Sequence, residues 1–141
     1  DYIRAGSDII TFHIEINEDI ENIIKKIKAK GIKCGLAIKP KTSWSEIQPY
    51  LQLIDQVIIM TVEPGFGGQE FMNDQVDKIK NISNYIKLNN LRVGIEIDGG
   101  INFETGKICV EAGANILVAG SFLFNQGNLI AATNSLSDKF N

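Results

Sequence analysis

Residues 57–71 read "VIIMTVEPGFGGQEF", an apolar run that is followed at once by a glycine-rich segment. The apolar run is typical of a buried β-strand. Glycine weakens both strands and helices, so Gly65, Gly67 and Gly68 indicate a loop whose backbone turns tightly or approaches a ligand closely. Because this loop begins where the strand ends, we interpret it as part of a phosphate-binding site.

Four further apolar or β-branched runs predict strands, and helical patterns separate them. The five predicted strands are Asp8–Ile14, Lys33–Ile38, Gln56–Val62, Leu91–Ile97 and Asn115–Ala119. The predicted helices are Glu18–Lys30, one opening with Ser43 and Glu46 in capping-box spacing, one with Val76, Ile79, Ile82 and Ile86 on one face, one opening at Asn102, and Asn128–Ser137. We expect Pro49 to kink or restart the second helix. Strands separated by helices of this length form parallel crossovers.

The alternation alone leaves two architectures open, a doubly wound sheet and a (β/α)8 barrel. A doubly wound dinucleotide fold places G-x-G-x-x-G after its first strand, and that pattern is absent from this sequence. Glycine-rich or polar segments instead follow three strands, at Pro64–Gln69, Asp98–Gly100 and Gly120–Ser121. The carboxyl ends of all barrel strands meet at one face, where active sites of this fold lie. The sequence therefore favours the barrel, with these segments around one site.

Asp98 brings ionisable chemistry to this predicted site. A carboxylate there can ligate a cation or transfer a proton, or it can simply cap its own loop beside Gly99 and Gly100. The segment "GSFLF", which starts at Gly120 and Ser121, fits a short helix whose backbone N–H groups face an anion.

His13 is the one histidine of the chain, and Glu15 lies two positions further on, hence on the same strand face. Two readings of His13 stay open: a hydrogen-bonded interior side chain, or a residue in contact with the substrate or its neighbours. Met60, at the end of the third predicted strand, is either core or an apolar wall of the site.

Composition gives a general frame. The 141 residues are 44% hydrophobic and 22% charged, which is normal for one globular domain. The net charge of −3 gives no reason to expect nucleic acid or an anionic membrane as a partner. Cys34 and Cys109 lack metal-type spacing, and we expect both to be buried free thiols. No apolar run reaches the roughly 20 residues that cross a bilayer, so a cytoplasmic location is expected.

The quoted stretch, together with "GIEIDGGI", "GANILVAGSFLF", "AGSDIITFHIE" and "GLAIKP", resembles the ribulose-phosphate 3-epimerase family. The resemblance implies a TIM barrel of the ribulose-phosphate-binding type. It also implies inversion of C3 of D-ribulose 5-phosphate to give D-xylulose 5-phosphate, in the pentose phosphate pathway. The family uses two aspartates to exchange the C3 proton through an enediolate, and a divalent metal stabilises the oxyanion. Zinc is the expected metal, with iron, manganese and cobalt as alternatives.

Carried over by position, the resemblance makes Asp98 both the metal-ligating and the proton-donating aspartate. It places Gly65, Phe66, Gly67 and Gly68 in a mobile loop over the substrate. The phosphate cradle is assigned to Gly99, Gly100, Gly120 and Ser121. Met60 matches a methionine that caps the site, and His13 matches a strand residue that is not a metal ligand.

The resemblance begins at the fourth strand of the family barrel, and family members are well over 200 residues long. We therefore expect residues 1–141 to form one domain, the C-terminal part of a TIM barrel with about five βα units, inactive alone. Two histidine ligands, a serine and the second catalytic aspartate belong to the first three units, so no tight metal site is expected here. Exposed outer edges of the first and last strands would favour misassembly. We expect the full-length enzyme to be a homo-oligomer.

Two alternatives to this function remain open from sequence. One is a 3-epimerase of a six-carbon ketose phosphate such as allulose 6-phosphate. The recognised residues bind the phosphate and do not distinguish a five-carbon from a six-carbon sugar. The other is a non-catalytic half barrel that binds phosphate.

Overall fold

The computed structural model describes residues 2–138 and contains one parallel sheet. Its strands are β1 (Ile9–His13), β2 (Lys33–Ile38), β3 (Gln56–Met60), β4 (Gly94–Asp98) and β5 (Ile116–Val118). The helices are α1 (Ile20–Lys28), α2 (Trp44–Ile47), α3 (Val76–Leu88), α4 (Phe103–Ala112), α5 (Gly120–Phe124) and α6 (Leu129–Asp138), with 3-10 turns η1 (Gln48–Tyr50) and η2 (Asn73–Gln75).

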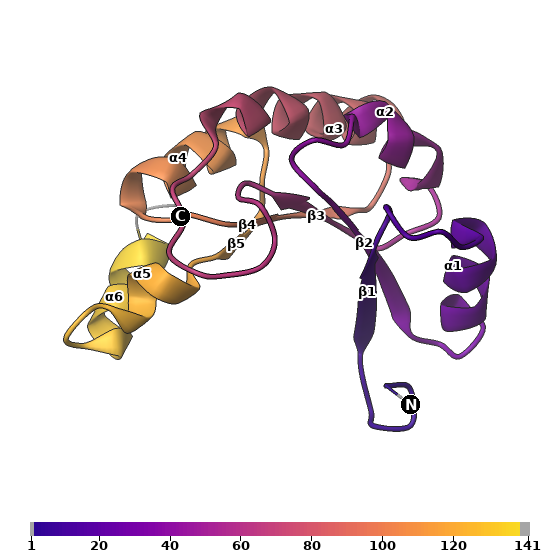
Figure 1. The fold of residues 1–141 in the computed structure, drawn as a ribbon, viewed down its shortest axis with the longest axis horizontal. Coiled ribbons are helices and arrows are strands. Elements are labelled where there is room, and N and C mark those ends of the chain that lie inside the picture. Colours follow the sequence, from indigo (N-terminus) through magenta and orange to yellow (C-terminus); the bar gives the residue numbers. More distant parts are fainter. Residues whose placement is uncertain (1, 139–141) are drawn as a thin grey trace.

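The strand order decides between the two predicted architectures. The strands pair in the order β1-β2-β3-β4-β5, and every pair is parallel. A doubly wound sheet reverses its strand order at a switch point, whereas a barrel adds each strand beside the last. Figure 1 shows α1 to α4 in an arc along one side of the strands. The chain is therefore a partial (β/α) barrel, as predicted.

The core lies between the sheet and these helices. Side chains of a strand alternate between the two faces of the sheet, and on the helix side Leu36, Ile59 and Ile97 are 0% exposed. On the other face, Ile58 and Glu96 are only half-buried. We call this second face the inner face, because it corresponds to the interior of a closed barrel.

The two cysteines lie on the covered side of the fold. Cys34 and Cys109 are both buried free thiols, as the sequence predicts. Burial raises the pKa of Cys34 to about 11 and that of Cys109 to about 12, so both thiols stay protonated at neutral pH.

Local sequence signals explain most helix boundaries. Asp19 caps α1 by accepting a hydrogen bond from the backbone N–H of Asn22 at 3.0 Å. Asn102, where the sequence predicts this helix to open, is the N-cap of α4 and forms a capping box with Thr105. The predicted restart of the second helix at Pro49 is confirmed, because η1 follows α2 directly with proline in its first turn.

Several predicted strands are shorter in the structure by one or two residues at an end, and two local predictions are wrong for an identifiable reason. β4 begins at Gly94 and not at Leu91, because the N–H of Leu91 bonds to the carbonyl of Ile86 at 3.0 Å and closes the end of α3. The capping box of Ser43 with Glu46 does not form, since the Ser43 hydroxyl accepts from the N–H of Ser45 instead.

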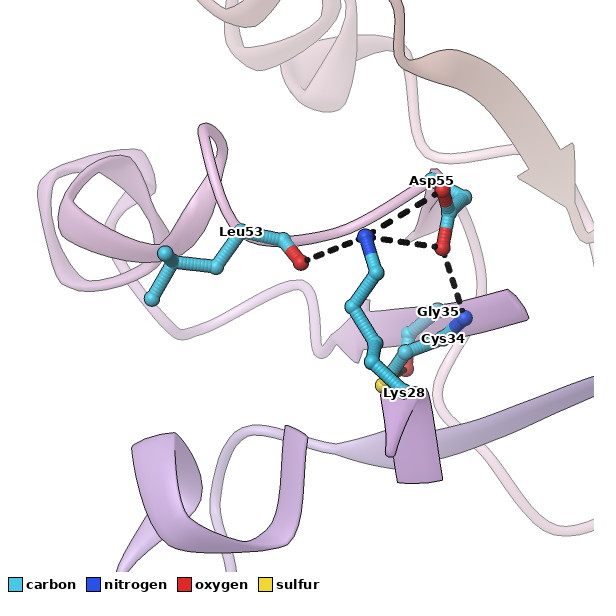
Figure 2. Close-up of polar contacts among 5 residues, drawn as sticks. All are labelled: Lys28, Cys34, Gly35, Leu53 and Asp55. Atoms are coloured by element: carbon cyan, nitrogen blue, oxygen red, sulfur yellow. Dashed lines mark hydrogen bonds and ion pairs between the residues drawn. The ribbon is translucent and has the colours of Figure 1, made fainter. Parts of the chain in front are cut away.

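Asp55 joins elements at the amino ends of the strands, on the side opposite the predicted site. Its carboxylate accepts a hydrogen bond from the N–H of Cys34 at 2.8 Å, and its own N–H donates to the Cys34 carbonyl at 2.8 Å. Lys28 reaches from α1 to the same carboxylate at 3.3 Å and to the Leu53 carbonyl at 3.1 Å (Figure 2). In barrels this end of the sheet serves stability and not catalysis.

Asp55→Ala is expected to lower the free energy of unfolding by about 1–3 kcal/mol, because the partly buried N–H of Cys34 would lose its acceptor. Urea denaturation of the 141-residue chain measures this change. Asp55→Asn is the matched control, since an amide oxygen can still accept that bond. The control loses only the half-exposed ion pair with Lys28, which contributes about 0–1 kcal/mol. Equal losses in both variants would contradict this assignment.

Candidate active site

A cavity of about 520 Å³ lies at the carboxyl ends of β3, β4 and β5. It is lined by all ten residues that the sequence assigns to the site: Met60, Gly65, Phe66, Gly67, Gly68, Asp98, Gly99, Gly100, Gly120 and Ser121. Segments that are far apart in the sequence thus meet at one place. Their individual roles in binding and catalysis stay predictions.

Asp98 is the last residue of β4, where it pairs in register with Met60 of β3. Burial raises the pKa of its carboxyl above the ordinary value of 3.8. Glu96, two residues earlier on the inner face, also has a raised pKa, first through burial and then through the negative charge of Asp98. The Gln56 amide donates a hydrogen bond to Glu96. Asp98 is therefore a carboxyl that takes up a proton more readily than one in water.

Thr61 ties the end of β3 to the end of β4. Its hydroxyl donates to the carbonyl of Gly99 at 2.6 Å, and its N–H donates to the carbonyl of Asp98 at 2.9 Å. The side chain of Thr61 is 0% exposed. Sequence reasoning missed this residue, because a threonine after an apolar run is equally typical of a strand continuation. Thr61 therefore fixes the backbone that directly follows the Asp98 side chain.

Gly99 and Gly100 let the β4 turn pack directly against the loop that follows β3. Both have positive φ, at 130° and 64°. A Cβ at Gly99 would lie 2.6 Å from a methyl carbon of Val62, and one at Gly100 would lie 2.6 Å from the backbone nitrogen of Phe71. No larger side chain fits at either position without moving the neighbouring loop.

The glycine loop between β3 and η2 is braced by its own glutamine. The Gln69 amide donates to the carbonyls of Glu63 at 2.7 Å and of Phe66 at 2.8 Å. The loop reaches α5, because a Cβ on Gly67 would lie 3.2 Å from the Ser121 hydroxyl. Phe66 at its tip is 75% exposed. The segment therefore covers the cavity from the β3 side and presents an apolar tip to solvent.

Gln69→Ala is expected to increase backbone hydrogen exchange in the glycine loop about tenfold, because two carbonyls lose the amide that holds the loop closed. Hydrogen exchange read by mass spectrometry measures this change over residues 63–69. Exchange in β3 and β4 should stay the same, since neither strand contacts the Gln69 amide. An unchanged loop would show that Gln69 does not brace it.

The cavity holds acidic but no basic side chains. Among the described residues that line it, Glu63 and Asp98 are acidic and none is lysine, arginine or histidine. An anion at this place would therefore be held by backbone N–H groups, as glycine-rich segments and helix amino ends can do. No described side chain caps the amino end of α5 at Ala119, so its N–H groups remain available to a ligand. Phe122 anchors α5 on Phe103 of α4, with ring centroids 5.0 Å apart.

His13 lies outside this cavity. Its Nδ1 is 3.2 Å from a carboxylate oxygen of Glu15, whose second oxygen accepts from the N–H of Lys39 at 2.8 Å. The two side chains meet, but the predicted sharing of one strand face is wrong, because β1 ends at His13 and Glu15 lies in the turn that follows. Of the two readings of His13, this contact supports the hydrogen-bonded side chain.

The described residues do not form a metal site by themselves. Within residues 2–138, no group of three or more histidine, cysteine, aspartate or glutamate side chains could hold a metal ion. Asp98 could supply one carboxylate ligand, which is fewer than a stable site requires. In the same range, no helix is long and apolar enough to cross a membrane.

Comparison with known proteins places this site in a family. The model of the ribulose-phosphate 3 epimerase family matches residues 1–124. The ribulose-phosphate 3-epimerase of Bacillus subtilis is 38% identical over 128 residues, which is 90% of this chain and 59% of that protein. The protein of the same name from Chlamydia pneumoniae is 39% identical over 130 residues, 91% of this chain and 57% of that protein.

Two solved structures share the fold at low sequence identity. A 3-hexulose-6-phosphate synthase superposes with a TM-score of 0.67 at 18% identity, covering 98% of this chain and 64% of that one. KGPDC from Streptococcus mutans gives a TM-score of 0.70 at 16% identity, covering 96% of this chain and 61% of that one. The chain spans less than two-thirds of the length of these relatives and structures. With a family match over residues 1–124 and relatives identical at 38% or more, this chain belongs to the ribulose-phosphate 3-epimerase family.

Proposed function

We propose that this chain forms part of a barrel that interconverts D-ribulose 5-phosphate and D-xylulose 5-phosphate. The observation that carries the proposal is the shared cavity: a carboxyl with a raised pKa, Asp98, lies beside a glycine loop and the uncapped start of α5. A phosphorylated sugar needs both an anion cradle and, for epimerisation, a group that moves a proton next to a carbonyl.

In the proposed reaction, Asp98 transfers the proton at C3 on one face of the sugar. Removal of that proton moves its bonding electron pair toward the C2 carbonyl oxygen and gives an enediolate. Return of a proton to the opposite face of C3 completes the inversion, so the reaction has no net proton change. The phosphate is held by N–H groups of Gly99, Gly100, Gly120 and Ser121. The glycine loop with Phe66 excludes water while the enediolate exists.

We propose that the reaction also uses a divalent metal ion. Zinc is the expected metal, and iron, manganese and cobalt are the alternatives. Asp98 would supply one ligand, and the other ligands would come from outside residues 2–138. The acid or base on the opposite face of the sugar would likewise come from outside this range. Bound there, the metal would stabilise the negative charge that develops on the C2 oxygen.

Two alternative functions stand beside this proposal. The first is epimerisation of a six-carbon ketose phosphate, because the lining residues are assigned here to the phosphate and the reacting carbon and not to the rest of the sugar. The second is a non-catalytic half barrel, because binding of phosphate by the lining segments does not itself require proton transfer.

The deciding experiment uses a fusion in which the part of the Bacillus subtilis relative that this chain does not match precedes residue 1. The assay follows deuterium from D₂O into C3 of ribulose 5-phosphate and of allulose 6-phosphate. Faster exchange of the five-carbon sugar supports the proposal, and faster exchange of the six-carbon sugar supports the sibling activity. Binding of both sugars without exchange supports the half barrel. A fusion that binds neither sugar contradicts all three functions.

A further inference from the structure

Asp55 and Asn115 perform the same task at two places in the sheet. Each directly precedes a strand, β3 or β5, and each bonds the second residue of the strand before it. The N–H of Cys34 donates to the Asp55 carboxylate at 2.8 Å, and the N–H of Ile95 donates to the Asn115 side-chain oxygen at 2.8 Å. The backbone N–H of Asp55 and of Asn115 donates in return to the same partner residues, at 2.8 and 3.0 Å. We call this reciprocal pair of bonds the strand clamp.

Asp8 occupies the corresponding place before β1. The first residue of the next strand bonds its carbonyl, from the N–H of Lys33 at 3.1 Å, as the N–H of Gly94 bonds the carbonyl of Asp55 at 2.9 Å. Asp8 and Asp55 therefore bond the following strand of the sheet in the same way, through their backbone carbonyls. Asp8, Asp55 and Asn115 directly precede β1, β3 and β5. These residues therefore recur at every second strand of the sheet.

On its other side, Asp8 has no preceding strand to bond among the described residues. β1 is an edge strand of the described sheet, and Asp8 is exposed. Among residues 2–138 the Asp8 carboxylate makes no hydrogen bond or ion pair. The Asp8 carboxylate, an acceptor, and the Asp8 backbone N–H, a donor, therefore lie at the edge of β1. They occupy the position from which Asp55 bonds Cys34.

We propose that Asp8 sets the register of the parallel strand that pairs with the β1 edge, through a third strand clamp. The second residue of the incoming strand would donate its N–H to the Asp8 carboxylate and accept from the Asp8 N–H. Its following residue would lie opposite Ile9 and point to the inner face, as Gly35 lies opposite Gln56. The occupant is a βα unit from the part of the family barrel that this chain does not span.

The fusion described above tests this inference through stability, which does not depend on catalysis. Asp8→Ala should lower the folding equilibrium constant of the fusion about tenfold, the effect of one lost hydrogen bond at a strand edge. The same substitution should change the 141-residue chain less than twofold, because Asp8 has no side-chain partner there. Asp8→Asn should stay within threefold of wild type in the fusion, since Asn115 shows that an amide oxygen suffices. Asp77→Ala is the matched control, because Asp77 is an exposed aspartate on α3 that loses only an exposed ion pair with Lys80, a contact of small effect.

Two results would overturn the inference. The first is an Asp8→Ala fusion that behaves like the Asp77→Ala fusion. The second is backbone hydrogen exchange in β1 that is as fast in the fusion as in the 141-residue chain. Native mass spectrometry of the 141-residue chain tests whether a second copy of the chain occupies the β1 edge instead. A dimer with protected β1 amides would overturn the proposed strand in favour of that second copy. Loss of epimerase activity with intact β1 protection would contradict only the proposed function.

Discussion

Asp98→Asn is expected to lower deuterium incorporation at C3 of ribulose 5-phosphate by about 10²–10⁴-fold in the fusion. Asparagine has nearly the same shape as aspartate but neither donates nor takes up a proton at neutral pH. The group that exchanges the C3 proton would therefore be lost while the cavity keeps its form. Single-turnover exchange followed by NMR separates this step from product release.

Phosphate binding should survive this substitution, because the proposed anion cradle consists of backbone N–H groups and does not include the Asp98 side chain. The affinity for inorganic phosphate, measured by calorimetry, is expected to stay equal or to rise, since a negative charge has left the cavity. Exchange within threefold of wild type would remove Asp98 from its assigned role. Loss of both exchange and phosphate binding would point to a collapsed site instead.

Stability provides the folding control for the same variant. Burial raises the folded pKa of Asp98, so its contribution to stability is full below the ordinary value of 3.8 and is lost as the pH rises through the folded value. At pH 7 the ionised side chain therefore destabilises the fold. In chelator-treated buffer, Asp98→Asn should unfold at a higher urea concentration than wild type at pH 7, with a smaller difference at pH 4. This sign is typical of a functional carboxyl kept at a cost to stability.

The sequence predicted the barrel because its chemistry is distributed over the ends of several strands. Pro64–Gln69, Asp98–Gly100 and Gly120–Ser121 could be placed together without coordinates, since the carboxyl ends of parallel strands share one edge. The same reasoning could not find Thr61 or Gln69 as structural supports. Their roles depend on which carbonyl lies within reach of a hydroxyl or an amide, and spacing in the sequence does not contain that information.

The strand clamps were also outside the reach of sequence reasoning. Asp55 and Asn115 look like ordinary turn residues before a strand, and one is charged while the other is an amide. Only the paired distances to Cys34 and Ile95 show that both residues do the same work. The start of β4 was misplaced for a related reason: Leu91 is apolar, but its N–H closes a helix.

Gly100→Ala is expected to lower the free energy of unfolding by about 2–4 kcal/mol and to abolish phosphate binding. The φ of 64° costs an alanine about 1 kcal/mol. The new Cβ would also lie 2.6 Å from the nitrogen and 2.8 Å from the Cα of Phe71, and backbone atoms cannot rotate away as a side chain can. Overpacking of this kind adds about 1–3 kcal/mol. The loop after β3 must therefore move away from the β4 turn, which separates the two halves of the cavity wall.

Two other glycines provide matched controls for this prediction, because a Cβ at Gly120 or Gly127 would meet nothing within 4 Å. Urea unfolding of both alanine variants should stay within about 0.5 kcal/mol of wild type. Gly120→Ala should weaken phosphate binding without a loss of stability, since it lines the cavity, and Gly127→Ala should change neither property. Close approach of backbone to backbone, and not glycine content as such, would then account for the sensitivity of Gly100. A Gly100→Ala chain as stable as Gly127→Ala would show that the loop after β3 can shift freely, and the close packing of Gly100 against Phe71 would not be what shapes the cavity.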